Sequence, residues 1–227
     1  MCGIAGFWQP TAQPHERVDL APQALAMVDS LRHRGPDDAG VWTDPFAGVA
    51  LAQRRLSIID LSAAGHQPMV SASGRFTIVF NGEIYNHAEL RTAVERSGFG
   101  VGWRGHSDTE SLLAAIEIWG LERALERSVG MFALALWDAM ARRLSLARDR
   151  LGEKPLYYGW QARTLLFGSE LVALRRHPAF RAQVDREALS RYLNRGYVAG
   201  AKSIYEGVER LPPGSLVHVS AEDAAHQ

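Results

Sequence analysis

The 227-residue chain is 47% hydrophobic and carries 25 basic and 25 acidic side chains, which suits one folded domain with an ordinary core. Its formal net charge of zero gives no field that attracts nucleic acid or an anionic membrane, so a small, specific ligand is the expected partner. No apolar run approaches the roughly 18 residues of a membrane span, and the first residues lack a signal peptide's basic start and long apolar core, so we expect a cytoplasmic protein.

The first predicted element is a strand over residues 2–8, which begins with the chain's single cysteine, Cys2. One cysteine cannot form an internal disulfide, so Cys2 is either an unreactive small hydrophobic residue or a reactive thiol. Because Gly3 is small, the initiator Met1 would normally be trimmed, which would give Cys2 a free amine. That amine could take the thiol proton and activate the sulfur as a nucleophile. Position alone leaves open a structural cysteine inside the strand.

A helix is predicted where Leu25, Val28 and Leu31 recur at helical spacing. An apolar stretch follows at residues 49–59 and contains Arg55 beside a second arginine. The guanidinium of Arg55 could bind a substrate carboxylate through two parallel hydrogen bonds. A solvated pair of surface arginines explains the same pattern, so the sequence leaves both interpretations open.

The run 76–80 is predicted to be a strand, and Asn81 and Gly82 follow it. With the partly apolar Ile84 and Tyr85 beyond them, Asn81 and Gly82 are typical of a tight hairpin turn. In the alternative interpretation, the Asn81 amide and the Gly82 N–H donate to an oxyanion, and glycine lets the backbone approach the substrate closely. The two interpretations are compatible with each other.

Two helices are predicted next, one with Leu90 and Val94 at helical spacing and one that opens at the pair Ser107 and Glu110, which resembles a capping box. Asp108 lies in the first turn of the second helix. A carboxylate there interacts favourably with the helix dipole without any ligand. Asp108 would therefore not be selected as a site residue from its position alone.

Several short apolar runs in the second half are predicted to be strands: residues 131–137, 144–147, 156–158 and 165–167. The connection between the first two is too short for a crossover helix, so they should form an antiparallel hairpin. An amphipathic helix follows Asp185 and ends at Gly196, and the alanine-rich tail at 221–227 should be frayed. Antiparallel strands interrupted by helices indicate an α+β layered fold.

Metal and nucleotide sites have no support in the sequence. The eight histidines and one cysteine show none of the spacings of metal ligands. The chain also lacks the glycine-rich loops that bind phosphate. We therefore expect no metal and no cofactor for this domain.

A set of motifs distributed over nearly the whole chain resembles the class II glutamine amidotransferases. They are CGIAGF (2–7), RHRGPDDAG (32–40), RRLSIIDLS (54–62), HQPM (66–69), FNGEIYNHAELR (80–91), SDTE (107–110), GMFALALWD (130–138), ARDRLGEKPLYY (147–158) and FGSEL (167–171). Within that class, RHRGPD, RLSIIDL and NGEIYNH are similar to the asparagine synthetase type.

The resemblance implies an N-terminal-nucleophile hydrolase fold, a four-layer α-β-β-α sandwich of two antiparallel sheets. It implies that Cys2 is the nucleophile with its own amine as base, and that Asn81 and Gly82 form the oxyanion hole. It further implies a binding pocket for glutamine in which Arg55 holds the α-carboxylate, Glu83 and Asp108 hold the α-ammonium, and the backbone of Leu56 and Ile58 completes the contacts, together with Asn81 and Gly82. The products would be glutamate and ammonia.

The same resemblance predicts a glutaminase domain over residues 1–215 and a tail, 216–227, that leads to an ATP-dependent synthetase domain. The alternative is a stand-alone glutaminase that delivers ammonia to a separate synthetase subunit. The SGG-x-D-S loop of such a domain does not occur in this chain, so ATP and Mg²⁺ are expected only with the synthetase part. Asparagine formation is the default outcome. Residues 196–215 are also similar to relatives that serve a sugar acid or another carboxylate in polysaccharide biosynthesis.

Two rival functions remain: another N-terminal-nucleophile hydrolase, such as an acylase, and a catalytically silent assembly domain. Arg55, Glu83 and Asp108 together complement a free amino acid, which argues against the acylase. Intact Cys2 and Asn81 argue against the silent domain. The sequence leaves a homodimer open.

Overall fold

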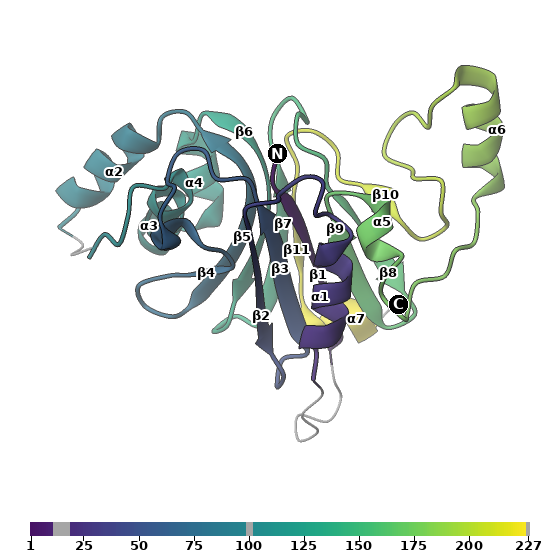
Figure 1. The fold of residues 1–227 in the computed structure, drawn as a ribbon, viewed down its shortest axis with the longest axis horizontal. Helices are drawn as coiled ribbons and strands as arrows, with labels where there is room; N and C mark the ends of the chain where they lie inside the picture. Colours follow the sequence, from purple (N-terminus) through teal and green to yellow (C-terminus); the bar gives the residue numbers. More distant parts are fainter. Residues whose placement is uncertain (11–18, 99–101, 226–227) are drawn as a thin grey trace.

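The computed structural model describes residues 1–10, 19–98 and 102–225, in which two antiparallel sheets lie face to face (Figure 1). The six-stranded sheet A has the order β10-β8-β9-β1-β3-β2, and the five-stranded sheet B has the order β11-β7-β6-β5-β4. The strands are β1 (Gly3–Trp8), β2 (Asp38–Asp44), β3 (Val49–Arg55), β4 (Met69–Val70), β5 (Phe76–Ile84), β6 (Gly130–Asp138), β7 (Arg143–Arg148), β8 (Tyr157–Gln161), β9 (Thr164–Gly168), β10 (Glu209–Arg210) and β11 (Leu216–Val219).

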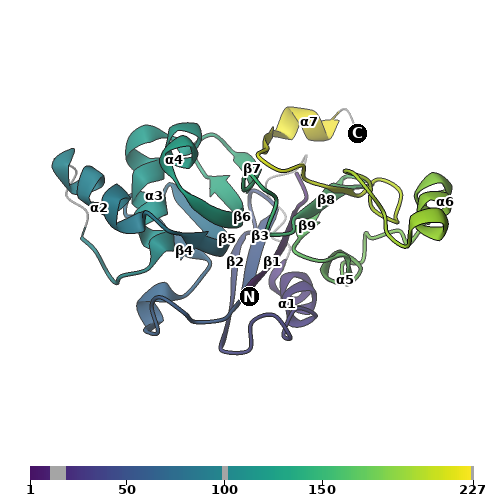
Figure 2. The same cartoon turned by 90° about the horizontal axis from the view of Figure 1, so that it is seen from above.

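Helices cover the outer faces of both sheets (Figures 1 and 2), which gives the four layers that the family resemblance implies. α1 and α5 pack on sheet A, while α2, α3 and α4 form one core with sheet B. The helices are α1 (Ala21–Asp29), α2 (His87–Arg96), α3 (Asp108–Trp119), α4 (Leu121–Arg127), α5 (Leu171–Leu174), α6 (Arg186–Arg195) and α7 (Ala221–Ala225), with a short 3₁₀ turn, η1 (Ala63–Gly65). The predicted α-β-β-α sandwich is confirmed.

Side-chain alternation along β1 explains why this strand is apolar at every position. Ile4 and Trp8 point into the core between the two sheets, whereas Ala5 and Phe7 point to the core under α1. Successive side chains of a strand face opposite sides of a sheet, and here both sides are covered. The Trp8 ring lies edge-on to that of Trp137 in sheet B, with 5.4 Å between the ring centroids.

The predicted hairpin is confirmed: β6 and β7 pair antiparallel, with Trp137 opposite Leu144. α1 is also present, but its predicted apolar stripe is only partly right, because Leu25 is exposed and Ala24, Met27 and Val28 face the core. The apolar runs therefore predicted which segments form helices and strands more reliably than they predicted which face of a helix is buried.

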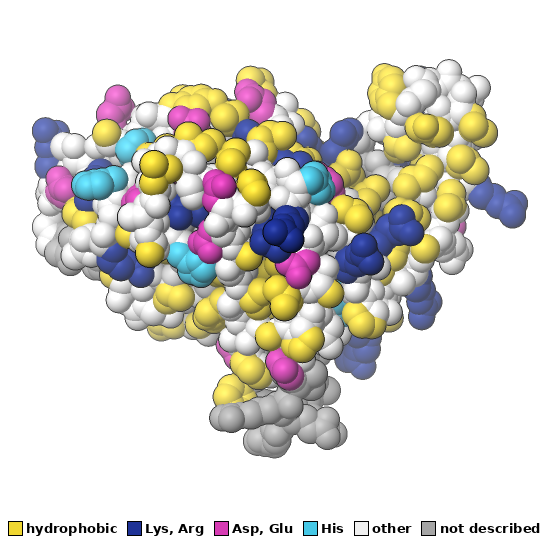
Figure 3. Space-filling view, in the orientation of Figure 1, with side chains coloured by type: hydrophobic (Ala, Val, Ile, Leu, Met, Phe, Trp, Pro, Cys, Tyr) yellow, Lys and Arg dark blue, Asp and Glu magenta, His cyan; other side chains and the backbone are white. Residues whose placement is uncertain are grey.

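α6 begins at its cap Asp185 and ends at Gly196, as predicted. Its apolar residues do not join a core in the described part of the chain, however, since Leu193 is 74% exposed and only Ala188 of this helix is buried. Hydrophobic side chains accordingly gather on the surface over α6 (Figure 3).

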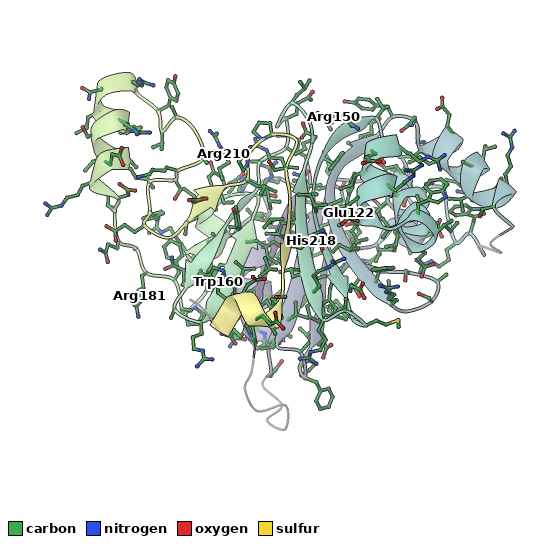
Figure 4. The ribbon with its side chains drawn as sticks, turned by 180° about the vertical axis from the view of Figure 1, so that it is seen from behind. Glu122, Arg150, Trp160, Arg181, Arg210 and His218 are labelled. Atoms are coloured by element: carbon green, nitrogen blue, oxygen red, sulfur yellow. The ribbon has the colours of Figure 1, made fainter. Side chains whose placement is uncertain are left out.

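The C-terminal segment forms part of sheet B. β11 pairs with β7 over its four residues, from Leu216 opposite Ala147 to Val219 opposite Leu144. His218 of β11 also lies 2.8 Å from Glu122 of α4, measured from Nε2 to Oε1 (Figure 4). The sheet thus continues beyond the domain boundary expected at residue 215. Residues 221–225 of the expected frayed tail are helical, and 226–227 lie outside the described residues.

Among the described residues, no helix is both long enough and apolar enough to cross a membrane.

Candidate active site

One cavity of about 210 Å³ lies where β1 begins, β3 ends and α3 begins. Every residue that the sequence predicted for the site lines this cavity: Cys2, Arg55, Leu56, Ile58, Asn81, Gly82, Glu83 and Asp108. These residues come from both sheets, from the loop after β3 and from the start of α3. The fold therefore brings together residues that are more than a hundred positions apart in sequence, such as Cys2 and Asp108.

Cys2 stands just before β1 and is half-buried, with its sulfur beside the loop after β3. The backbone N–H of Leu56 donates to Sγ at 3.4 Å, and the thiol lies 3.6 Å from the carbonyl oxygen of Leu56. The alternative of a structural cysteine inside the first strand is not favoured, because β1 starts at Gly3 and the Cys2 side chain faces the cavity.

Arg34 fixes the main chain at Cys2, a role that the sequence analysis missed. Its Nε donates to the Cys2 carbonyl oxygen at 2.9 Å, and its terminal nitrogen lies 2.8 Å from Glu170. Burial raises the pKa of Glu170, but hydrogen bonds from Arg34 and His33 outweigh burial and hold this pKa below its ordinary value. The RHRGPD motif contains Arg34, but nothing in its spacing indicates a contact with residue 2.

Arg55 is only 9% exposed, so the interpretation as a solvated surface arginine is wrong. Its guanidinium donates to the backbone carbonyls of Ser62, at 3.0 Å, and of Asp60. A Cβ on Gly65 would lie 2.0 Å from a terminal nitrogen of Arg55, so a larger residue here would displace the guanidinium. The loop after β3 therefore wraps closely around a guanidinium that faces the cavity.

Asp60 is a second residue that the sequence analysis missed, and it ties this loop to the segment before α3. It accepts hydrogen bonds from the hydroxyl and the backbone N–H of Ser62, at 2.6 and 2.8 Å, and from the backbone N–H of His106 at 3.0 Å. These hydrogen bonds, first of all that from the Ser62 hydroxyl, lower the pKa of Asp60 to about 2. The carboxylate thus stays ionised and keeps one wall of the cavity in place.

Asn81 and Gly82 lie within β5, which runs without interruption from Phe76 to Ile84, so the hairpin-turn interpretation is wrong. The amide Nδ2 of Asn81 is buried and has no hydrogen-bond partner among the described residues. Asn81 itself is 1% exposed and lines the cavity. A buried, unpartnered donor is costly, and this amide is placed to donate to an acceptor that a ligand brings into the cavity.

The N–H of Gly82 faces the open edge of β5. The N–H of Phe80 donates to Gln67 at 2.7 Å and that of Ile84 donates to Asp108 at 2.9 Å, both away from β6. Residues two apart in a strand direct their N–H groups to the same side, so the Gly82 N–H points the same way and lies between them. Gly82 and its neighbour Asn81 both line the cavity.

The structure gives glycine at position 82 a reason that the sequence did not show. A Cβ there would come within 2.2 Å of the Met131 carbonyl oxygen and 2.7 Å of Phe132 Cα, both in β6. The two strands β5 and β6 thus approach each other closely at this position. Sequence inspection could not identify which neighbour required the missing side chain.

Asp108 begins α3, and its buried carboxylate accepts from the backbone N–H of Ile84 and of Thr109, both at 2.9 Å. Burial raises the pKa of Asp108, and these two hydrogen bonds oppose that rise only in part. Ser107 caps the helix as predicted, through the N–H of Glu110 at 3.0 Å. The Glu110 carboxylate accepts instead from the N–H groups of Arg104 and Gly105, so the reciprocal half of a capping box is not formed.

The remaining predicted residues border the cavity. Glu83 lies on β5 and is half-buried, and Leu56 lies in the loop beside Cys2. Ile58 also borders the cavity, but its side chain is 68% exposed. In the described part of the chain, no group of three or more His, Cys, Asp or Glu side chains could hold a metal ion.

Comparison with known proteins agrees with this geometry. The family model described as a glutamine amidotransferase domain matches residues 1–227. Asparagine synthetase [glutamine-hydrolyzing] 3 of Bacillus subtilis is 35% identical over 233 residues, covering 98% of this chain and 35% of the relative. Asparagine synthetase [glutamine-hydrolyzing] 1 of the same organism is 36% identical over 217 residues, covering 95% and 33%. The chain therefore spans about a third of the length of the curated relatives it matches.

Two solved structures share the fold. The glutamine phosphoribosylpyrophosphate amidotransferase of B. subtilis superimposes with a TM-score of 0.65 at 18% identity, covering 97% of this chain and 48% of that one. A structure described as the allosteric regulatory enzyme of purine biosynthesis gives a TM-score of 0.68 at 19% identity, covering 97% and 47%. Given the match along the whole length and the sandwich of two antiparallel sheets, the chain belongs to the class II glutamine amidotransferase family, together with the glutamine-hydrolysing asparagine synthetases.

Proposed function

We propose that this domain hydrolyses glutamine to glutamate and ammonia, with Cys2 as the nucleophile. The observation that carries this proposal is the convergence in one cavity of a thiol, an unpartnered buried amide donor at Asn81, and charged groups of both signs. A cavity of about 210 Å³ suits a molecule as small as an amino acid.

Glutamine enters with its charged end toward Arg55 and Asp108. The guanidinium of Arg55 pairs with the α-carboxylate, while Asp108 and Glu83 pair with the α-ammonium. Arg55 is held by backbone carbonyls rather than by a carboxylate, so its positive charge remains available to the substrate. Backbone groups of Leu56 and Ile58 complete this end of the pocket, and the side-chain amide extends toward Cys2.

The chemistry requires Cys2 to be the first residue, because only then does it carry a primary amine. The amine takes the thiol proton, and sulfur forms a bond to the side-chain amide carbon of glutamine. The resulting oxyanion accepts hydrogen bonds from Asn81 Nδ2 and the Gly82 N–H. The carbon–nitrogen bond then breaks, ammonia leaves with the proton returned by the ammonium, and a thioester remains. Water adds to the thioester, and glutamate and the free thiol are regenerated.

The ammonia acceptor would bind to an ATP-dependent synthetase domain or subunit, and ATP and Mg²⁺ would be needed only there. The named relatives are asparagine synthetases and are about three times as long as this chain, which favours aspartate as the acceptor over a sugar acid. We place the protein in the cytoplasm, and a homodimer stays open. The domain itself is proposed to use no cofactor.

The test is an intact-mass measurement of the mature protein before and after treatment with 6-diazo-5-oxo-norleucine, alongside an assay of glutamate release from glutamine. We expect a mass without Met1, a single adduct on Cys2 and glutamate production that is independent of ATP. A protein with Met1 removed that neither forms the adduct nor releases glutamate would contradict the proposal and favour a silent assembly domain.

A further inference from the structure

Lys154 is a buried cation in the cavity wall that the proposed mechanism does not use. It is only 7% exposed and lines the same cavity as Cys2. Its backbone is fixed, since its N–H donates to Asp149 at 3.0 Å and its carbonyl oxygen accepts from Arg148 at 2.7 Å. In the described parts of the chain, the bonds of Lys154 are those of its backbone, and its ammonium has no ion-pair or hydrogen-bond partner there.

The chain uses lysine very rarely. Of its 25 basic lysine and arginine residues, only Lys154 and Lys202 are lysines. Lys202 lies at the surface, where it pairs with Asp185 at 3.2 Å and with Glu187 at 2.6 Å. Lys154 therefore differs from the other lysine both in its burial and in having no acidic partner among the described residues.

The strand order places Lys154 and Arg55 on opposite sides of Cys2. β3, which ends with Arg55, is one neighbour of β1, and the other side of β1 is occupied by β9 and then β8. Lys154 lies shortly before β8, and the start of β8 is at the same end of the sheet as the start of β1, because Tyr157 pairs with Gly168 and Gly168 with Ala5. The two cations thus flank the nucleophile.

The position of Lys154 relative to Arg55 indicates which end of the bound amino acid it contacts. Arg55 accounts for the α-carboxylate of the substrate, so a second cation across Cys2 lies toward the reacting end of the bound amino acid. Glutamine is neutral at that end, but negative charge appears there on the oxyanion and persists in the side-chain carboxylate of glutamate. The Lys154 side chain is largely shielded from solvent and has no acidic partner among the described residues, so its ammonium attracts a charged ligand oxygen more strongly than a neutral amide.

We infer that the ammonium of Lys154 binds the negatively charged oxygen at the side-chain carbon of the ligand, as oxyanion during the reaction and as the side-chain carboxylate of glutamate afterwards. The inference rests on the proposed glutaminase function. It predicts that Lys154 discriminates between glutamate and glutamine, because it binds the charged species and not the neutral amide. Binding that is stronger in the transition state than in the substrate raises kcat.

The kinetic test compares Lys154→Met, Lys154→Arg and the matched control Lys202→Met. A hydrogen bond to a charged group corresponds to roughly tenfold to a hundredfold in binding. We expect Lys154→Met to weaken competitive inhibition by glutamate at least tenfold and to lower kcat, with the KM for glutamine changed less than about threefold. Lys154→Arg should restore part of the loss, and Lys202→Met should change neither constant. If the inhibition constant for glutamate and the KM for glutamine rise by the same factor, or if neither rises, the inference is wrong.

A second measurement needs no change at Lys154 and no turnover. With ¹³C placed at the lysine Cε atoms, the two lysines give two NMR signals, and the Lys202→Met variant assigns them. In a Cys2→Ala background, glutamate should shift the Lys154 signal more than glutamine does, and the Lys202 signal should stay in place. Equal shifts with the two ligands would overturn the role of Lys154 even if glutaminase activity is present. If neither glutamate nor glutamine binds, both this inference and the proposed function are overturned.

Discussion

The backbone N–H of Leu56 donates to Sγ of Cys2 across 3.4 Å. This contact joins the residue before β1 to the loop that carries Arg55 and Asp60, so the thiol and the proposed carboxylate-binding group share one support. A change that displaces this loop would therefore also shift the Cys2 thiol.

Cys2→Ala should abolish both glutamate release and the adduct with 6-diazo-5-oxo-norleucine, because no sulfur remains to form the thioester. The melting temperature should change little, since Cys2 is half-buried and precedes β1. Assays of activity beside thermal melts check both points. Glutamate release by the purified variant at the wild-type rate would contradict the assignment of the nucleophile.

An N-terminal extension that survives before Cys2 should reduce kcat strongly while alkylation of the thiol continues, because the base has become an amide. The matched control is the same protein after a protease has removed the extension and left Cys2 first. Recovery of activity upon cleavage would identify the amine as the base. Equal activity before and after cleavage would exclude it.

Asn81→Ala should lower kcat by roughly 10² to 10³, the range observed when one oxyanion donor is removed, with a smaller change in KM. Its melting temperature should stay close to that of the wild type, because the Asn81 Nδ2 has no partner among the described residues. Gln53→Ala is the structural control. Its amide donates to the Phe80 carbonyl oxygen at 2.7 Å, so it should lose about 1–3 kcal/mol of stability. The opposite outcome, an unstable Asn81→Ala with normal kcat, would assign Asn81 a purely structural role.

Gly82→Ala should destabilise the domain, because the added Cβ would meet the Met131 carbonyl oxygen at 2.2 Å and neither strand can move away without disturbing the sheet. Gly102→Ala, where an added Cβ meets nothing within 4 Å, serves as the control. Urea unfolding of both variants measures the difference. Equal stability of the two would show that β5 and β6 tolerate a side chain at this position.

Acidification should weaken the fold through His177. Burial lowers the pKa of this histidine to about 4 from an ordinary value of 6.5, and its Nδ1 accepts from the N–H of Ala179 at 3.1 Å, which requires the unprotonated form. Between pH 6.5 and about 4 the unfolded chain therefore binds a proton that the folded chain does not. The free energy of unfolding should fall by up to about 3 kcal/mol over this window.

His177→Asn keeps an acceptor for Ala179 and removes the titration, so it should flatten that part of the pH profile. Urea unfolding at several pH values checks the difference between variant and wild type. An identical pH slope for the two proteins would assign the acid sensitivity to other groups.

The family resemblance implied the order of layers, whereas the β6–β7 hairpin followed from the residues themselves, because apolar strands joined by a short connection leave a local signal. It could not predict which face of α6 would be covered, since Leu189 and Leu193 have the spacing of core residues but remain exposed. The helical spacing of apolar residues indicates that a helix has an apolar face, but it does not show which part of the protein covers that face. The short strands β4 and β10 were missed for a related reason, because two residues are too few for an alternation to be visible.

The positions of the site residues came from motif resemblance, and the structure places them in one cavity. The residues that hold them could not be found in the same way. Arg34 reaches the Cys2 carbonyl and Asp60 reaches the His106 N–H, and each contact joins segments more than thirty positions apart. Such contacts depend on tertiary geometry. Asn81 and Gly82 illustrate the converse error, in which a local turn pattern occurs inside a continuous strand.

The pairing of β11 with β7 has a practical consequence for anyone who shortens this domain. A chain that stops at residue 215 would lack Leu216–Val219, and one side of β7 would present unpaired N–H and C=O groups to solvent. Exposed strand edges of this kind recruit strands from other molecules. Such a shortened protein should self-associate at rising concentration, because its edge would be the six-residue β7, whereas a version that retains Val219 presents the shorter, four-residue β11 at that edge.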